Sequence, residues 1–399
     1  MVSRPLEGLV VVDLTRFVAG PYATSVLAAL GAEVLKIESP EGDPYRSQGT
    51  EQAQGESVLF MSLNAGKRSV ALDFRVPAGR AALERLLQRA DFFVENSRPG
   101  SLDRYGLDWA SLHGRFPALV VGSIWGYGDT GPAASKGGFD LILQAESGVM
   151  SVTGSPESGP VKVGAPLLDV GAGLACALGL LAAHIERLAT GQGRLVSTSL
   201  LEFALAGLST VASAYLASGR VPGLLGTHSP TFAPYGGFRT ADGWIVMAGA
   251  GSEEMWHRAC RALGLEALAA EDRFADNARR VAHRDELTAA LEEALGRQTT
   301  AFWLAELTRA GVPAAEVRAL DQVLDSPQVA ALGLLTSLSH PRAGEVATLG
   351  PPLRLDRSPL GYPRPAPVLG ADTQAVLMGA GLDAAEVAGL VAGGVAVTA

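Results

Sequence analysis

The first third of the chain alternates short apolar, β-branched runs with segments of helical periodicity. Residues 9–14 are rich in valine and are bounded by Gly8 and Thr15, so they predict a buried strand of a parallel sheet. Similar runs predict further strands at residues 34–37, 69–72, 92–95 and 119–124.

Helical segments lie between these strands. A helix is expected over residues 21–30, and another begins at Pro77, where the missing N–H of proline costs nothing. The second helix carries an apolar stripe spaced i, i+3, i+4 and i+7, at Leu83, Leu86, Leu87 and Ala90. Strands that alternate with helices imply βαβ units. The expected fold class is therefore α/β, with a doubly wound, mostly parallel, Rossmann-like sheet.

Three segments directly follow predicted strands, at residues 15–21, 73–75 and 96–100. In a doubly wound sheet, ligands bind outside the carboxyl ends of the strands. We therefore expect these segments to converge on one crevice.

The sequence pattern in the second half of the chain indicates that a second domain begins there. Long apolar helices are expected at residues 169–188 and 200–217, around a short strand, and the pattern changes after Gly219. A turn-rich linker precedes a hairpin around residues 241–243, and helices then continue to Ala310. The pattern predicts a large domain made of residues 1–219 and 331–399, and a smaller α+β domain over residues 220–330.

Composition narrows the functional classes. Hydrophobic residues make up 48% of the 399 residues and charged residues only 18%, which excludes a disordered chain. The 32 Lys and Arg against 41 Asp and Glu give a net charge of −9, so no nucleic-acid partner is expected. Cys176 and Cys260 cannot build a disulfide framework or a thiolate metal site, and the six histidines lack metal-binding spacing, so no metal is expected.

The sequence also gives little indication of a membrane span or of a site for a nicotinamide cofactor. The longest uncharged stretch of the core, residues 170–185, is shorter than the roughly 20 residues of a membrane span, and the N-terminus does not resemble a signal peptide. We therefore expect a cytoplasmic protein with no membrane partner. No Gly-x-Gly-x-x-Gly follows the first strand, which argues against NAD.

One acidic residue stands out because small residues surround it. Asp169 lies between Gly164 and Gly171, directly before a predicted long helix. In one interpretation its carboxylate is an N-cap that accepts helix N–H groups. In the other, the helix N-terminus keeps Asp169 ionised and aimed at a cleft, where a carboxylate can attack an acyl carbon.

Several ordered motifs resemble a known family. They are the opening PLEGL (residues 5–9), DLTRFVAGP (13–21), LGAEVLKIE (30–38), Asn64 with KRS (67–69), VENSRPG (94–100) and GYGDTGP (126–132). Together they resemble the family III CoA-transferases, whose superfamily includes formyl-CoA:oxalate and carnitine CoA-transferases and α-methylacyl-CoA racemase. The resemblance covers nearly the whole chain.

The resemblance implies a mechanism centred on Asp169. This residue would attack the thioester of an acyl-CoA to give an aspartyl–acyl mixed anhydride, and CoA thiolate would return to give an aspartyl-CoA thioester. An acceptor carboxylic acid would then reverse the cycle, in a site that excludes water. The family fold also implies an interlocked homodimer, with CoA as substrate.

The resemblance further implies which residues contact CoA. They are Phe17, Val18, Ala19, Leu72, Arg75, Asn96, Ser97, Arg98, Arg104, Lys136 and Phe139. The basic residues suit the phosphate groups of CoA, although each alone could equally be solvated surface charge. Two positions depart from the family: Val18 stands where the oxalate-specific member has glutamine, and Ser39 stands where a basic residue is expected.

Two further residues have open roles. Asp140 stands where some transferases have a second acid, so it either orders the acceptor or caps the helix that follows it. Arg46 could hold a second carboxylate, because a guanidinium binds carboxylates in a bidentate manner. The resemblance to family members that use dicarboxylates points to substrates such as succinate, malate or glutarate.

Two alternatives to a transferase stay open. The racemase branch moves an α-proton with a histidine in a Gly-His-Asp segment, but this chain has Phe139 before Asp140, and phenylalanine cannot accept a proton. A CoA-binding protein without catalysis is disfavoured by the intact Asp169.

Overall fold

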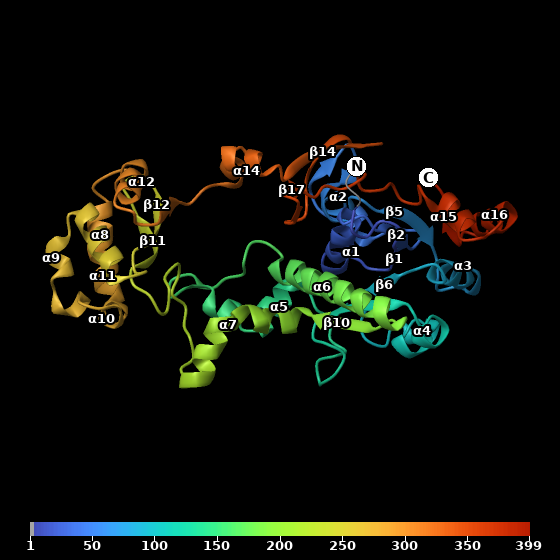
Figure 1. Cartoon of the computed structure of the whole chain (residues 1–399), viewed down its shortest axis with the longest axis horizontal. Helices are drawn as coiled ribbons and strands as arrows, with labels where there is room; N and C mark the ends of the chain where they lie inside the picture. The colour runs from blue at the N-terminus through green and yellow to red at the C-terminus, as the bar shows by residue number, and fades with distance from the viewer. Residues whose placement is uncertain (1–3) are drawn as a thin grey trace. The chain divides into compact units, whose positions relative to one another are not determined.

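The computed structural model describes residues 4–399, which divide into two compact units (Figure 1). The large unit comprises the chain up to Ser147, Gly164–Ser209 and Pro327–Ala399, and the small unit comprises Gly148–Val163 and Thr210–Ser326. The borders differ from those predicted at residues 219/220 and 330/331. The main difference is that residues 148–163 belong to the small unit.

Within the described residues, the large unit is built on a seven-stranded sheet of order β10-β7-β6-β1-β2-β5-β18. All neighbouring strands are parallel except β18, which is antiparallel to β5. This confirms the mixed α/β class with a mostly parallel sheet. The strands are β1 (Val10–Asp13), β2 (Glu33–Glu38), β5 (Arg68–Leu72), β6 (Phe92–Glu95), β7 (Val120–Trp125), β10 (Leu195–Ser199) and β18 (Ala396–Val397).

The order of the strands reverses beside β1. From β1 the chain adds β2 and β5 on one side, and then returns to place β6 and β7 on the other side. The carboxyl ends of β1 and β6 therefore flank a topological switch point, which is where such sheets bind ligands.

Helix α3 (Pro77–Leu87) shows how a helix of the large unit buries an apolar face against this sheet. It begins at Pro77 as expected, and Leu83, Leu86 and Leu87 are buried in the main core. The other helices are α1 (Ala19–Ala29), α2 (Val58–Asn64), α4 (Trp109–Arg115), α5 (Asp140–Glu146), α6 (Leu167–Thr190), α14 (Pro327–Leu332), α15 (Thr373–Gly379) and α16 (Ala384–Ala392).

Helices α1 and α6 pack closely because small residues face each other. A Cβ on Gly173 would lie 2.5 Å from the carbonyl oxygen of Ala19, closer than real contacts allow. Glycine at this position therefore lets the start of α6, which carries Asp169, approach the start of α1.

Helices α6 and α7 (Leu200–Ser218) are long and apolar enough to cross a membrane by length and composition, although the sequence analysis expected no such segment. In the most apolar window of α6, 44% of residues are buried inside the protein. In α7 the share is 11%, and Ser209 (φ 36°, ψ −105°) interrupts the helical backbone.

The small unit contains an antiparallel sheet of β11 (Tyr235–Arg239), β12 (Trp244–Ala248) and β13 (Ala314–Glu316) among its described residues. The first two strands form the predicted hairpin. Its core includes Trp256, Phe274 and Leu291. The helices are α8 (Glu253–Leu263), α9 (Glu266–Ala269), α10 (Asn277–Ala282), α11 (Arg284–Leu295), α12 (Thr300–Arg309) and α13 (Leu320–Leu324).

Short strand pairs complete the chain. They are β3 (Gln52–Ala53) with β4 (Glu56–Ser57), β8 (Gly154–Ser155) with β9 (Gly159–Pro160), β14 (Leu335–His340) with β15 (Gly344–Leu349), and β16 (Arg354–Leu355) with β17 (Ser358–Pro359).

Candidate active site

Segments that follow the strands line a cavity of about 590 Å³, which we call the arginine cavity. Residues after β1, β2, β5 and β6 meet there, as the strand pattern predicts. Four guanidinium groups line it: Arg16, Arg75, Arg98 and Arg104. Such a set of cations at the carboxyl edge of a sheet suits a polyanionic ligand.

A second cavity of about 330 Å³ contains Asp169, and we call it the Asp169 cavity. The turn after β1, the end of β7 and the segment before α5 supply its other walls. Arg16, Ser97 and Arg98 line both cavities. The two cavities are therefore neighbours, and a long ligand with a charged end could occupy both.

Asp169 lies in the first turn of α6 and is not its N-cap, because the cap position is Pro166. Burial, and then the negative charge of Asp140, raise the pKa of Asp169 to about 7. The sequence analysis expected a helix N-terminus to keep this group ionised. The opposite effect dominates, because removal from water and the negative charge of Asp140 both disfavour the ionised form of Asp169.

Asp140 holds the N-terminus of α6. Its carboxylate accepts hydrogen bonds from the backbone N–H of Leu168 at 2.9 Å and of Asp169 at 3.3 Å, and from the side chain of Gln144. Asp140 is also the first residue of α5, whose cap is Phe139. It therefore caps the later helix, α6, instead of the helix that follows it directly.

The turn after β1 has a strained backbone. Phe17 has φ of 65°, in the left-handed region that side chains other than glycine rarely adopt. Its ring makes edge-on contacts with Tyr45 (5.5 Å between centroids) and Phe139 (5.9 Å). All three rings line the Asp169 cavity. Surrounding contacts must hold this conformation.

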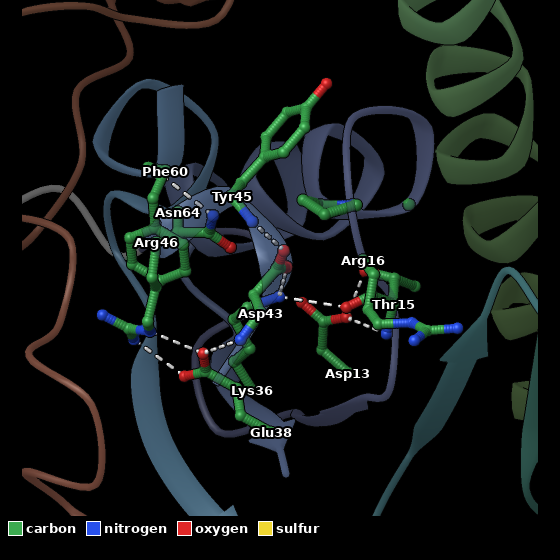
Figure 2. Close-up of polar contacts among 12 residues, drawn as sticks. Asp13, Thr15, Arg16, Lys36, Glu38, Asp43, Tyr45, Arg46, Phe60 and Asn64 are labelled. Atoms are coloured by element: carbon green, nitrogen blue, oxygen red, sulfur yellow. Dashed lines mark hydrogen bonds and ion pairs between the residues drawn. The ribbon is translucent and has the colours of Figure 1, made fainter. Parts of the chain in front are cut away.

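Buried ions supply those contacts (Figure 2). The Lys36 ammonium donates to the carbonyl oxygen of Thr15 at 3.0 Å and to the Asp43 carboxylate at 2.9 Å, and both charged side chains are fully buried. Asp13 accepts from the backbone N–H of Thr15 at 2.9 Å and from Lys67 at 3.0 Å. The start of the turn is therefore fixed from two sides.

Electrostatics within this network favour ionised Asp13. Burial opposes ionisation, but the charges of Lys67 and Lys36 together with hydrogen bonds from Thr15 and Thr24 hold the pKa of Asp13 below its usual value. Burial lowers the pKa of Lys67 to about 8, although Asp13 counteracts this.

Most residues expected to contact CoA line one of the two cavities. Phe17, Val18, Ala19, Asn96, Lys136 and Phe139 line the Asp169 cavity; Arg75 and Arg104 line the arginine cavity; Ser97 and Arg98 line both. The fold therefore brings these segments together around two neighbouring cavities.

Leu72 is an exception. Its side chain is fully buried in the hydrophobic core, because it is the last residue of β5 and points between the sheet and its helices. The Leu72 side chain therefore lines neither cavity, and the expected contact of this residue with CoA stays a prediction.

Arg46 is the second exception. Its guanidinium donates to both carboxylate oxygens of Glu38, at 2.7 and 2.8 Å, and to the carbonyl oxygen of Pro367 at 3.0 Å. It also lies over the Phe60 ring, 3.6 Å from the centroid. Glu38 already occupies its bidentate face, which argues against the predicted role of Arg46 in holding a substrate carboxylate.

Sequence reasoning missed Arg16, Tyr45 and Trp125, which line the Asp169 cavity. Arg16 could have been found, since it directly follows Thr15 in a segment expected at the crevice. Tyr45 lies in a short helical turn, η1 (Pro44–Arg46), whose position depends on tertiary contacts. Within residues 4–399, no group of three His, Cys, Asp or Glu side chains is arranged to hold a metal ion.

Known proteins resemble this chain in sequence and in fold. Residues 6–373 match CoA-transferase family III. The chain belongs to this family. It is 35% identical to succinyl-CoA:glutarate CoA-transferase of Mus musculus, over 94% of this chain and 86% of the mouse protein. It is 36% identical to succinate–glutarate CoA-transferase of Agrobacterium fabrum, over 94% and 95%.

Solved structures of the family agree on the fold. A CAIB/BAIF family protein from Brucella suis superposes with a TM-score of 0.83 at 36% identity, covering 94% of this CoA-transferase and 99% of the Brucella protein. The family resemblance found in the sequence motifs is confirmed, and so is transferase activity on CoA thioesters and carboxylic acids.

Proposed function

We propose that this family III CoA-transferase moves CoA from a dicarboxylic acyl-CoA such as succinyl-CoA to a second dicarboxylic acid such as glutarate, through covalent intermediates on Asp169. Relatives at about 35% identity are named for succinyl-CoA and glutarate. The observation that carries the proposal is a half-buried carboxyl group, Asp169, in a cavity that shares Arg16, Ser97 and Arg98 with an arginine-lined cavity.

The chemistry begins when a carboxylate oxygen of Asp169 attacks the thioester carbon. A C–O bond forms, the C–S bond breaks and CoA leaves as the thiolate, giving a mixed anhydride. The thiolate then attacks the aspartyl carbonyl, giving an aspartyl-CoA thioester and the free donor acid. The acceptor carboxylate repeats these steps in reverse, so no water is consumed.

The arginine cavity suits the phosphate groups of CoA. Arg75 is paired with Asp73 at 2.7 Å, whereas the exposed Arg16, Arg98 and Arg104 have no carboxylate within ion-pair distance among residues 4–399. Cations without an internal partner can neutralise phosphates without first breaking an ion pair. With the phosphates there, the pantetheine could extend past Arg98 toward Asp169.

Phe139 favours transfer over racemisation. It lines the Asp169 cavity with 61% of its surface exposed, at the position where the racemase branch has its histidine. An aromatic hydrocarbon there cannot exchange an α-proton.

A second copy of the chain is the proposed cover for apolar helix surface. Large side chains of α6 and α7 are exposed: Leu178 70%, Ile185 68%, Leu188 75%, Leu205 51% and Leu216 80%. Apolar surface of this extent is typical of an interface. We propose that the chain forms the interlocked homodimer expected from the family. We also propose that its large domain is Rossmann-like and that the protein is cytoplasmic and not bound to a membrane. Sedimentation of the purified protein as a compact monomer without detergent would contradict the dimer.

Isotope transfer tests the function. Wild-type protein incubated with succinyl-CoA and ¹³C-glutarate should move label into the thioester pool, and hydroxylamine quenching should convert Asp169 to a hydroxamate detectable by mass spectrometry. Asp169→Asn should lose transfer, by about 10³-fold or more, because its amide is a poor nucleophile. Label transfer with residue 169 unmodified, or undiminished in Asp169→Asn, would refute the mechanism.

A further inference from the structure

Tyr45 presents an unused hydroxyl group to the Asp169 cavity. It lines that cavity together with Asp169, and no hydrogen bond joins its hydroxyl to another of residues 4–399. Figure 2 shows the ring directed away from the ionic network, with its hydroxyl at the far end. A half-buried polar group without a protein partner is available to a ligand.

The protein backbone around Tyr45 is held firmly. Its N–H donates to the Asp43 carboxylate at 3.0 Å, and the same carboxylate is paired with buried Lys36 at 2.9 Å. The next residue, Arg46, is fixed to Glu38. The Tyr45 ring also meets the Phe17 ring edge-on. The hydroxyl is therefore preorganised, which a hydrogen-bond donor to a transition state requires.

Other polar side chains of the cavity are already engaged or lie toward the CoA end. Asn96 exchanges hydrogen bonds with the backbone of Arg16 at 2.7 and 2.9 Å. Lys136 is 3.4 Å from the carboxylate of Glu146. Arg16 and Arg98 also line the arginine cavity, where phosphate is expected. The side chains of Ser97 and Trp125 hydrogen-bond to the carboxyl group of Glu95. Among the described side chains of the cavity, Tyr45 is thus the neutral donor that stays free to serve the reacting carbonyl.

We propose that the Tyr45 hydroxyl is a catalytic group that donates a hydrogen bond to the acyl carbonyl oxygen as Asp169 attacks the thioester. This inference rests on the proposed function. Negative charge develops on the carbonyl oxygen while the C–O bond to Asp169 forms. The electron pair of this oxygen then re-forms the C=O bond as the C–S bond breaks, and the charge leaves on the CoA thiolate. The tyrosine keeps its proton throughout, so the bonds formed and broken in the transfer are the same with or without it.

Two observations agree with this role. Burial, and then the charge of Asp169, raise the pKa of Tyr45, so its hydroxyl stays a donor at neutral pH. The adjacent turn residues Phe17, Val18 and Ala19 offer only apolar side chains, so the turn itself supplies no side-chain donor. An oxyanion formed in this cavity needs such a donor, because no water is to be admitted.

The test compares Tyr45→Phe with Tyr22→Phe, a matched loss of a hydroxyl from a half-buried tyrosine of α1 that lies outside both cavities. Steady-state rates are measured with succinyl-CoA and glutarate, and quenched-flow trapping with hydroxylamine measures formation of the acyl-enzyme. For Tyr45→Phe, kcat and the trapping rate should fall about 100-fold, with KM for succinyl-CoA changed less than about two-fold. Tyr22→Phe should match the wild type.

Other outcomes overturn the inference. If the wild type is active and kcat is unchanged in Tyr45→Phe, the role of Tyr45 is contradicted while the proposed function stands. A raised KM with unchanged kcat would show a hydroxyl that binds the ground state and does not assist the chemical step. Inactivity of the wild type toward this substrate pair would contradict the proposed function, and the inference with it.

Discussion

The carboxylate of Asp140 accepts a hydrogen bond from the backbone N–H of Asp169 at 3.3 Å, and its charge helps to raise the pKa of the Asp169 carboxyl group. One acid therefore fixes the first turn of α6 and at the same time tunes the nucleophile. A raised pKa makes the carboxylate more basic, and a more basic oxygen is a stronger nucleophile once it has lost its proton.

This relationship predicts the pH dependence. Because Asp169 reacts as the carboxylate and its pKa is about 7, kcat/KM should rise with pH through about 7 and then level off. Asp140→Asn removes a negative charge but keeps an oxygen that can accept the Leu168 N–H, so the pKa of Asp169 should fall and the acid limb should move to lower pH. The pH profile of kcat/KM measures this. The exposed Asp325→Asn serves as control, and a limb that does not move in Asp140→Asn would contradict the coupling.

Lys36 should matter for stability. Lys36→Met leaves the fully buried Asp43 without its cation and the carbonyl of Thr15 without its donor. Loss of one partner of a buried ion pair typically costs about 3–5 kcal/mol, so urea unfolding should show a loss of this order. Arg297→Met breaks an exposed pair with Glu293 and should change little. Equal midpoints for both variants would show that the buried pair is not needed.

Arg46→Ala should not alter the choice of acid. Because the guanidinium is bound to Glu38, its loss leaves an almost fully buried carboxylate short of a partner and should destabilise the fold by about 3 kcal/mol. The ratio of kcat/KM for glutarate to that for butyrate should stay within about two-fold of wild type. A KM that rises for glutarate alone would restore the original hypothesis of a substrate carboxylate at Arg46.

Arg98→Ala should weaken binding of the CoA substrate. Arg98 lines both cavities and is exposed, so it can contact phosphate or pantetheine on the path to Asp169. Loss of one charge-assisted hydrogen bond should raise KM for succinyl-CoA about 10-fold, and added salt should weaken binding less in the variant than in the wild type. Arg297→Ala, on the small unit, is the control; similar KM values in both would remove Arg98 from the binding site.

The sequence predicted the fold well where burial forces a simple pattern. β1 and β6 are buried on both faces and read as apolar runs, and Pro77 begins α3 because proline tolerates only that helical position. Convergence of the loops followed from parallel strands alone, since all their carboxyl ends lie at one edge.

Other features depend on contacts that the local sequence pattern does not encode. Asp140 caps α6 across 28 residues, and Arg46 meets Glu38 through the fold of the turn between them. Leu72 looked like part of a binding segment, but it is the last residue of β5, whose final four residues are all buried, and the exposed segment begins only after the strand. Local patterns do not contain this information, so the motifs located segments that line the two cavities but not the surroundings of these two side chains.

The antiparallel strand β18 has a consequence for how the polypeptide is made. Strand β5 is the edge strand of the parallel part of the sheet until Ala396 and Val397 pair with it. The backbone N–H of Ser69 also donates to the carboxylate of Asp372, 303 residues later in the chain. On the ribosome, the small unit must emerge before this border of the sheet can be closed. Until then an unpaired, apolar strand is open to pairing with other nascent chains, so chaperone binding during translation should concentrate on this interval.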